Sequence, residues 1–429
     1  MRIRAGFAAT LVLVVVLALG PAGTSAAPSV ASSENAVVYW NGVAATAIAV
    51  GRAPASSAVL GGMVNGAIYD AVAAVEGGLE PFATGVTAPP GASVEAAVAT
   101  AARDVLVARV PAQASTVETA YGLYMGSLPA EGKEAGRLVG AAAAAGMIAL
   151  RFGDGFDAVL PFTQKLPLGP GVFEPIAPPP LGTVPGAPVD PKLALVRPFT
   201  HDSPSDYRPD GPLELTSKRY ARDLAEVQAY GRLVSSVRTP LQLETVLFHT
   251  EQTFVQFSRT LRGLAVARGL DVRESARLLG YVNVATADTM LACFEAKYYY
   301  HFWRPNHAIQ RADTDGNAAT APEANWLPRV TGNHPEYPSG HACFTGAVTE
   351  SLRNYFGTKE VRLEITSLAT GAGPMRTYEN LDELVTDVEN ARVWGGLHYR
   401  TTMTDTAKDF PRIARDIGKR YFLVKDKDD

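Results

Sequence analysis

Three short stretches in the last third of the chain combine fixed cations with imidazoles. They are KYYYHFWRP at 297–305, PSGH at 338–341 and ARVWGGLH at 391–398. They supply the cations Lys297, Arg304 and Arg392 and the imidazoles of His341 and His398. Guanidinium and ammonium groups, together with the free N–H groups of a helix N-terminus, are the donors that bind tetrahedral oxyanions. The pattern therefore predicts a site that grips an oxyanion and carries out proton transfer or covalent chemistry on it.

The first stretch holds two cations in an aromatic setting. Lys297 and Arg304 are seven residues apart, a spacing that returns to nearly the same face of a helix about 10 Å further along. The residues between them are largely aromatic, which indicates burial: Tyr298, Tyr299, Tyr300, Phe302 and Trp303. Because a buried cation needs an anionic partner, a shared anion is favoured over two solvated surface charges.

The second stretch lies directly before an apolar helical pattern. Ser339 is placed to cap that helix, Gly340 lets a ligand approach the backbone, and His341 falls in the first turn. An ordinary capped helix with an incidental histidine explains these four residues equally well.

The third stretch places a cation and an imidazole on either side of two glycines. Arg392 and His398 can face one pocket if Gly395 and Gly396 turn the chain between them. The alternative is an arginine that interacts with the dipole at its helix C-terminus, followed by a core histidine.

The elements that must position these residues are helices, and no convincing series of strands is present, so we predict an all-α fold. Residues 28–152 are an N-terminal helical half, residues 153–215 a connector rich in glycine and proline, and residues 216–429 a C-terminal helical bundle that carries the site. A segment of the connector's length and composition is either a linker or an arm wrapped on the surface.

Capping patterns predict where the helices of the second half begin. Starts are expected at Thr239, Asp271, Ser339, Asn380 and Thr402. The helix after Thr239 is expected to run to about Gly263, and the one after Asp271 to about Tyr300. Pro305 should push Arg304 into extended backbone.

Residues 1–27 are predicted to be a secretory signal peptide. Arg2 and Arg4 give a basic start, residues 11–19 an apolar run, and residues 22–27 small side chains for cleavage. The run is short for a membrane span, and an uncleaved anchor is the alternative. We therefore expect a secreted or extracytoplasmic protein without membrane attachment. The net charge of −4 gives no general reason to bind nucleic acid.

Two cysteines accompany the chemical stretches. Cys293 lies four residues before Lys297, and Cys343 lies two residues after His341. In an exported protein they can form a disulfide. Two separate buried thiols are the alternative, and the sequence leaves both open.

The order and spacing of the stretches, KX6RP, PSGH and RX5H, resemble the pattern shared by vanadium-dependent haloperoxidases and the type 2 phosphatidic acid phosphatase superfamily. The resemblance covers residues 297–402. The flanking segments RYARDLAEV, RTPLQLE, HPEYPSGH and RVWGGLHYR are similar to the secreted bacterial haloperoxidase branch. This resemblance implies an all-helical fold built from two helical bundles.

The resemblance also implies a role for each residue. The residues implied to hold the equatorial oxygens of vanadate, or of phosphate in the same site, are Lys297, Arg304, Ser339, Gly340 and Arg392. His398 is implied to bond axially to vanadium, His341 to act as the acid–base group, and Lys297 to activate bound peroxide. Hydrogen peroxide then oxidises a halide to a hypohalite equivalent, which halogenates a small organic substrate.

Three further histidines lie near the site residues. His334 occupies a position that is often histidine in bromide-type enzymes, which favours bromide and a halide pocket there; a histidine packed beside Pro335 is the alternative. His301 and His307 flank Arg304; structural or surface roles are favoured for them, and lining the pocket is the alternative. The oligomeric state stays open, with a homodimer as one option.

Two other functions compete with the haloperoxidase. In an acid phosphatase of the same superfamily, His398 is the nucleophile that forms a phosphohistidine and His341 protonates the leaving group. The third hypothesis is a non-catalytic exported oxyanion-binding protein. It arises because Thr402 stands where many haloperoxidases have the aspartate that orients the axial histidine. Chain length, the flanking segments and His334 favour the haloperoxidase.

Overall fold

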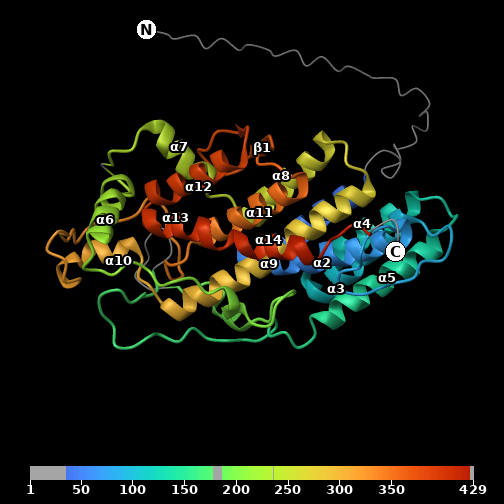
Figure 1. Ribbon diagram of the computed structural model, residues 1–429, viewed down its shortest axis with the longest axis horizontal. Helices are drawn as coiled ribbons and strands as arrows, with labels where there is room; N and C mark the ends of the chain where they lie inside the picture. The colour runs from blue at the N-terminus through green and yellow to red at the C-terminus, as the bar shows by residue number, and fades with distance from the viewer. Residues whose placement is uncertain (1–34, 177–185, 235, 426–429) are drawn as a thin grey trace, which may run out of the picture.

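The computed structural model describes residues 35–176, 186–234 and 236–425, and the predicted signal peptide lies outside these ranges. The described residues form helices together with one two-stranded sheet. Figure 1 shows an elongated body with the N-terminal helices gathered at one end and α6, α10 and α13 towards the other. The predicted all-α class is confirmed.

The N-terminal bundle packs closely because its helices are rich in small residues. It consists of α1 (Ala36–Ala49), α2 (Pro54–Glu76), α3 (Val94–Arg109), α4 (Ala114–Ser127) and α5 (Lys133–Leu150). A Cβ added at Gly140 of α5 would lie 2.2 Å from the carbonyl oxygen of Ala97 in α3. Glycine at this position therefore lets the two helices approach closely.

The connector is bonded to the core at residues 199–200. Between α5 and α6 (Lys218–Tyr230), its described residues contain only the short 3-10 helices η2 (Pro191–Leu195) and η3 (Pro204–Tyr207). The buried carboxylate of Asp288 accepts hydrogen bonds from the backbone N–H groups of Phe199, at 2.6 Å, and Thr200, at 3.0 Å. These bonds fix the connector on the long helix that carries Asp288.

The C-terminal bundle is organised around that long helix. Its helices are α7 (Pro240–Phe248), α8 (Thr253–Ala267), α9 (Val272–Tyr300), α10 (Pro305–Gln310), α11 (Gly340–Phe356), α12 (Leu381–Trp394), α13 (Arg400–Asp409) and α14 (Pro411–Arg420). The short 3-10 helix η4 (Ala312–Thr314) follows α10. Helix α9 packs on α2 of the N-terminal bundle and on α11 and α14 of its own. It thus joins the two bundles.

One small sheet lies outside the helical prediction. Strands β1 (Leu363–Thr366) and β2 (Met375–Tyr378) pair antiparallel, and β1 packs on α8. Each strand has only four residues, too few to give a period-two pattern that stands out in the sequence.

Most of the predicted helix starts are confirmed. Thr239 and Asp271 form complete capping boxes, and the side chains of Ser339 and Asn380 cap α11 and α12. Two expectations were wrong. The helix after Thr239 ends at Phe248 and a new helix begins at Thr253. Helix α13 begins at Arg400, so Thr402 does not cap it.

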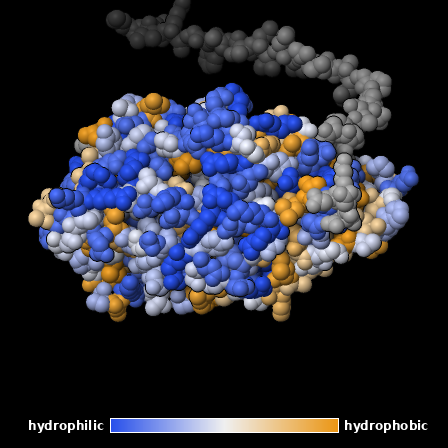
Figure 2. Space-filling view, viewed as in Figure 1, coloured by the Kyte–Doolittle hydropathy of each residue, from blue (hydrophilic) through white to orange (hydrophobic). Residues whose placement is uncertain are grey.

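Apolar side chains on the surface are scattered. The face in Figure 2 is mostly hydrophilic, with isolated hydrophobic residues between the charged ones. Within the described part of the chain, α2 is long and apolar enough to cross a membrane by composition, but 83% of its most apolar window is buried inside the fold. Its apolar character therefore serves the core.

Candidate oxyanion site

A cavity of about 430 Å³ lies where α8, α9, α11 and the end of α12 meet. Six of the residues singled out in the sequence line it: Arg304, His334, Gly340, His341, Arg392 and His398. Its apolar wall includes Met290, Phe294 and Phe344, and part of its polar rim comes from residues 250–253. Stretches that are up to about a hundred residues apart in the chain therefore meet at one cavity.

The connector and the N-terminal bundle both contribute to this cavity. Val189 of the connector and residues 53–55 at the start of α2 are part of its lining. The backbone N–H of Val189 donates to the carbonyl of Asn333, at 2.8 Å, and its carbonyl accepts from the Tyr298 hydroxyl. The connector thus forms part of the cavity wall.

Arg304 is held rigidly by the loop around it. Its Nε donates to the carbonyl oxygen of His334, at 2.7 Å, and its Nη1 donates to that of Leu397, at 2.8 Å. Its backbone is extended, with φ −76° and ψ 154°, as predicted from Pro305. Because α9 ends at Tyr300, Arg304 and Lys297 do not share one helical face; the chain reversal after α9 brings them together instead.

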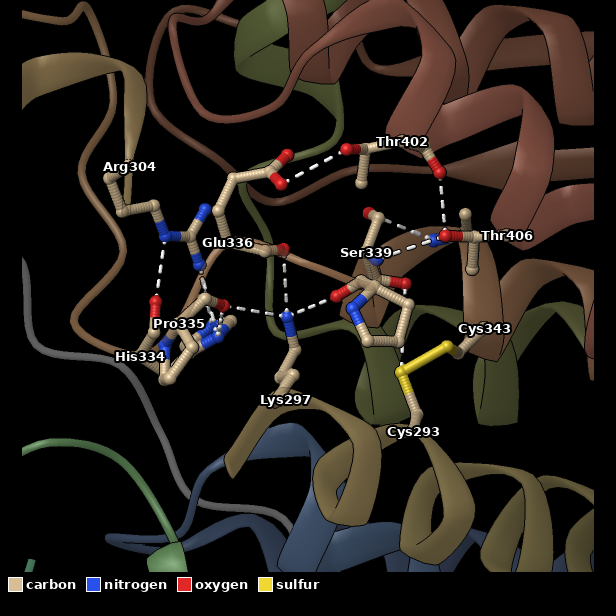
Figure 3. The surroundings of a disulfide bond; sticks show 12 residues. Cys293, Lys297, Arg304, His334, Pro335, Glu336, Ser339, Cys343, Thr402 and Thr406 are labelled. Carbon is tan, nitrogen blue, oxygen red and sulfur yellow. Dashed lines mark hydrogen bonds between the residues drawn. A yellow bond between two sulfur atoms is a disulfide. The ribbon is translucent and has the colours of Figure 1, made fainter. Parts of the chain in front are cut away.

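Lys297 lies one layer behind the cavity wall. It is fully buried, and its Nζ donates to the carbonyl oxygens of Pro335, at 2.9 Å, Glu336, at 3.2 Å, and Pro338. Figure 3 shows the ammonium group pointing into this ring of carbonyls. Lys297 therefore braces the loop that leads into α11.

Arg392 is a buried cation with unused hydrogen-bonding capacity. Its Nη1 donates to the carbonyl oxygen of His249, at 3.0 Å, while its buried Nε has no hydrogen-bond partner. A buried guanidinium N–H group without a partner is costly. An anion in the cavity, which Arg392 lines, would satisfy it.

The three cations are buried without carboxylate partners. Lys297, Arg304 and Arg392 are 0%, 2% and 5% exposed, and within the described ranges none of them forms an ion pair with a carboxylate. Burial lowers the pKa of Arg304 to about 10 and that of Arg392 to about 9, and it lowers the pKa of Lys297 well below its usual value. Repulsion from Arg304 acts in the same direction on Lys297 and Arg392. The cavity therefore carries positive charge that the nearby Glu336 carboxylate offsets only in part, and it favours an anion.

The N-terminus of α11 adds neutral donors to this charge. The Ser339 hydroxyl oxygen accepts from the N–H of Ala342, and the N–H of Ser339 donates to the hydroxyl of Thr406, at 3.1 Å. Ser339 is fully buried and, like Lys297, stands behind the cavity lining, whereas Gly340 lines it. The first turn of the helix directs its positive end at the cavity.

His398 has a defined contact on each ring nitrogen. Its Nδ1 lies 2.8 Å from Oε1 of Glu336, and its Nε2 lies 3.3 Å from Nη1 of Arg304. Burial lowers the pKa of His398 well below 6.5, and the nearby cations lower it further. Arginine can only donate, so Nε2 must be the acceptor nitrogen and Nδ1 carries the proton.

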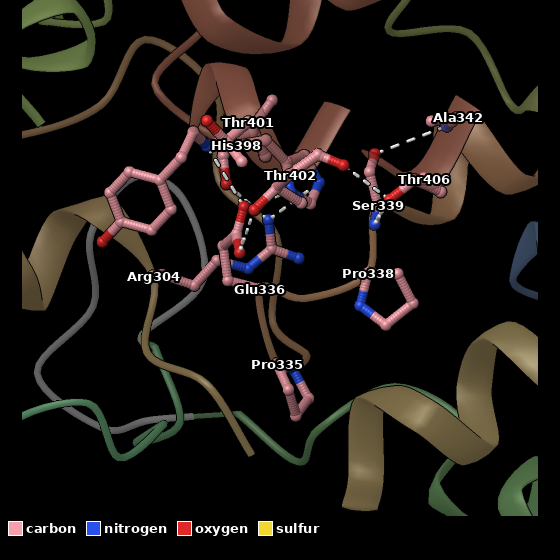
Figure 4. A network of polar contacts seen from close by, with 12 residues as sticks. Arg304, Pro335, Glu336, Pro338, Ser339, Ala342, His398, Thr401, Thr402 and Thr406 are labelled. Atoms are coloured by element: carbon pink, nitrogen blue, oxygen red, sulfur yellow. Dashed lines mark hydrogen bonds and ion pairs between the residues drawn. The ribbon is translucent and has the colours of Figure 1, made fainter. Parts of the chain in front are cut away.

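Glu336 is the functional residue that sequence reasoning missed. Its Oε1 also accepts from the N–H of Tyr399, at 3.2 Å, and its Oε2 accepts from the Thr402 hydroxyl, at 3.0 Å. Figure 4 shows the carboxylate between Arg304, His398 and Thr402. The only signal for it in the sequence was an acidic residue two positions before Pro338 in HPEYPSGH, with nothing to indicate its partner.

His341 lines the same cavity as His398. Its Nε2 lies 3.2 Å from the hydroxyl of Thr253, and it forms a second hydrogen bond with the backbone of His249. Burial and the nearby Arg392 hold the pKa of His341 well below 6.5. A neutral imidazole at the cavity wall can accept a proton or pass one on.

Of the three further histidines singled out in the sequence, one lies at the cavity and two lie away from it. His334 lines the cavity, lies 3.0 Å from Nη2 of Arg304 through Nδ1, and packs against the ring of Phe294. His301 ends α9 with a positive φ of 53° and stacks on Phe162. His307 lies in α10. Neither His301 nor His307 is among the residues that line the cavity.

A disulfide joins the helices on which the site is built. Cys293 of α9 bonds to Cys343 of α11, which decides between the two alternatives that the sequence left open (Figure 3). The bond lies one turn before Lys297 and within the first turn of α11. The disulfide therefore links the end of α9 that carries Lys297 covalently to the N-terminus of α11.

Comparison with known proteins identifies the C-terminal bundle. Residues 277–423 match the sequence family described as the VCPO second helical-bundle domain. The vanadium chloroperoxidase of Curvularia inaequalis is 34% identical over 94 residues. Residues 277–423 therefore belong to this domain family of vanadium chloroperoxidases. The matched segment spans 19% of this chain and only 15% of the Curvularia protein.

Solved structures share the fold of this chain over most of its length. A bacterial vanadium-dependent iodoperoxidase superposes with a TM-score of 0.76 at 19% identity, covering 91% of this chain and 97% of its own. An apo-type bacterial vanadium-dependent chloroperoxidase gives a TM-score of 0.66 at 17% identity, covering 85% and 93%. The arrangement of both bundles is thus common to these proteins.

Proposed function

We propose that the protein is a vanadate-dependent haloperoxidase that oxidises halide with hydrogen peroxide to a hypohalite equivalent. The observation that carries the proposal is the set of three buried cations without carboxylate partners around a neutral imidazole whose acceptor nitrogen lies beside Arg304. Structural cations are normally paired with acids, so this set favours a bound oxyanion. The similarity of the C-terminal bundle to vanadium chloroperoxidases supports vanadate as that oxyanion.

The donor set fits vanadate, and phosphate equally. Arg304, Arg392 and the N–H groups at Gly340 would hold its oxygens, and Ser339 would stand behind them with its hydroxyl. Lys297, whose three N–H groups already donate to carbonyls, would add positive charge from behind the cavity wall. His398 would ligate vanadium through Nε2, because Nδ1 is already bound to Glu336. When bound, vanadate supplies a Lewis-acidic centre that activates hydrogen peroxide without change of its own oxidation state.

The reaction needs one proton for each turnover. Hydrogen peroxide takes two electrons from the halide: H2O2 + X⁻ + H⁺ gives HOX and water. His341 is placed to move that proton at Nε2, the ring nitrogen that contacts Thr253 at the cavity rim. His341 can take that proton from solvent and pass it to the oxygen that leaves as water.

The cavity also suggests which substrates to test. His334 lies in its wall, which supports bromide as the first halide to assay, and the iodoperoxidase among the structural relatives adds iodide. Met290, Phe294 and Phe344 give an apolar wall suited to a small apolar organic substrate.

The disulfide supports export to an oxidising compartment, as the predicted signal peptide does.

A pair of assays separates this function from the alternatives. Purified protein is incubated with orthovanadate, peroxide and bromide or iodide, and halogenation of a dye is followed; hydrolysis of a phosphomonoester is measured without vanadate. We expect halogenation that is lost in His398→Ala. Phosphate release without halogenation would instead identify a phosphohistidine phosphatase. Vanadate binding without either activity would identify a non-catalytic binding protein, although Glu336 removes the missing-aspartate argument for that hypothesis.

A further inference from the structure

Glu336 is a fully buried carboxylate whose oxygens meet three groups from one turn of the chain. Oε1 contacts Nδ1 of His398 and the N–H of Tyr399, and Oε2 contacts the hydroxyl of Thr402. Its pKa is raised to about 7 by burial, against the opposing effect of Arg304 and Lys297. No ion pair between Glu336 and either cation is present in the described residues, so its closest partner is the imidazole.

The contacts on the two ring nitrogens of His398 select the same tautomer. A carboxylate at Nδ1 requires that nitrogen to carry the proton, and the guanidinium at Nε2 requires that nitrogen to accept. Partners of this kind fix the orientation of a ligating histidine and raise its basicity. If the ring were reversed, Nε2 would move away from its present position beside Arg304. If the tautomer changed, Nε2 would carry the proton and would no longer offer a lone pair.

The same residue also connects His398 to Lys297. The backbone carbonyl of Glu336 accepts from Nζ of Lys297 while its side chain holds the imidazole. A shift of this residue would therefore move a cation and an imidazole together. Thr402 bonds to the free carboxylate oxygen and prevents the side chain from rotating away.

We infer that Glu336 is the positioning residue of His398. Glu336 lies in the loop before α11 and supplies the carboxylate that Thr402, in α13, lacks. Thr402 then serves as the clamp on that carboxylate. The consequence for vanadate rests on the proposed function, whereas the tautomer of His398 does not.

Variants that remove the carboxylate at position 336 and introduce one at position 402 test this role. The variants are Glu336→Ala, Glu336→Gln and the double variant Glu336→Ala with Thr402→Asp, which returns a carboxylate from the other side. Glu350→Gln is the matched control, since Glu350 is a buried glutamate of α11 that pairs with Arg353 and Arg415 away from the cavity. Circular dichroism and thermal unfolding establish that each variant folds.

Two measurements read out positioning rather than stability. The first is the tautomer of His398, from ¹⁵N chemical shifts of histidine-labelled protein without added anion. The second is the calorimetric affinity for orthovanadate and for inorganic phosphate. We expect Glu336→Ala to lose the Nδ1–H tautomer and about 10- to 100-fold in vanadate affinity, and the double variant to recover both. Glu350→Gln should change neither.

The outcomes distinguish this inference from the proposed function. Unchanged tautomer and affinity in Glu336→Ala, or no recovery in the double variant, would overturn the positioning role even in an active haloperoxidase. If the tautomer of His398 and the vanadate affinity both depend on Glu336 but the protein does not halogenate, the positioning role stands and only the haloperoxidase proposal is rejected. If Glu336→Ala does not fold, Glu336→Gln is compared with and without Thr402→Asp by the same criteria.

Discussion

Nδ1 of His398 lies 2.8 Å from Oε1 of Glu336, across 62 residues of sequence. Neither residue belongs to a helix: Glu336 lies in the loop before α11, and His398 lies in the turn between α12 and α13. The hydrogen bond therefore joins two loops that are fixed by different helices. It also accounts for threonine at position 402, where the family resemblance leads one to expect aspartate.

The first prediction concerns Arg392. Replacing Arg392 with Met should weaken binding of orthophosphate and orthovanadate about 10- to 100-fold, because one charge-assisted hydrogen bond to an anion contributes roughly 1.5–3 kcal/mol. Folding stability should not fall in proportion, since the variant removes a buried cation that has no carboxylate partner among the described residues. Isothermal titration calorimetry and thermal unfolding measure the two quantities.

Arg400 provides the control for this variant. It pairs with Glu226, and the same substitution there removes the same charge away from the cavity lining. Arg400→Met should leave anion affinity within about twofold of the wild type. Equal losses in both variants would show that affinity depends on net charge rather than on Arg392 itself.

The second prediction is that an oxyanion stabilises the fold. In the folded state the pKa values of Lys297, Arg304 and Arg392 are lowered, so keeping these groups charged at neutral pH costs stability. A bound anion offsets this cost, and at 100 times its dissociation constant it adds about 2.7 kcal/mol. Thermal unfolding in phosphate should therefore show a higher Tm than in chloride of equal ionic strength. Identical curves would contradict the assignment of the cavity as an anion site.

Much of the frame was predictable because local patterns determine it. The capping boxes at Thr239 and Asp271 and the cap at Ser339 depend on residues within one turn, which a sequence displays directly. The extended backbone of Arg304 follows from Pro305 alone. Arg304, Gly340, His341, Arg392 and His398 could be named as one site because their types and order resemble a known family.

What remained hidden depends on contacts between distant residues. The helix predicted to run from Thr239 to about Gly263 breaks after Phe248, and the carbonyl of His249 at that break accepts from Arg392. Thr402 resembled a helix cap in the sequence but is instead a donor to Glu336. Neither partner can be found from spacing, because both lie far away along the chain.

The third prediction concerns the pH dependence of stability at Asp70. Its buried carboxylate accepts from the backbone N–H groups of Phe82, Ala83 and Thr84, and burial raises its pKa from 3.8 to about 6. The folded state thus binds this proton more tightly than the unfolded chain does. Stability should fall by roughly 2 kcal/mol as pH rises from about 4 to about 7.

The variant Asp70→Asn isolates this effect. It cannot ionise, so the difference in unfolding free energy between wild type and variant should change by that amount across the same pH interval, as measured by denaturant titration. Asp202→Asn at an exposed position is the control and should leave the pH dependence of the wild type unchanged. A pH-independent difference for Asp70→Asn would mean that Asp70 is already ionised in the folded protein at pH 4.

The fourth prediction couples the disulfide to the site. Cys293 and Cys343 close a loop with a sequence separation of 50, for which restriction of the unfolded chain contributes about 4 kcal/mol. The variant Cys293→Ala/Cys343→Ala should lose stability of that order. It should also bind orthovanadate more weakly, because α9 with Lys297 and α11 with Gly340 are no longer bonded to each other.

Reductant should lower the Tm and the affinity of the wild type in the same way and leave the variant unaffected. If the variant keeps its vanadate affinity while losing stability, the disulfide supports the fold alone, and packing between α9 and α11 is sufficient to hold the site together.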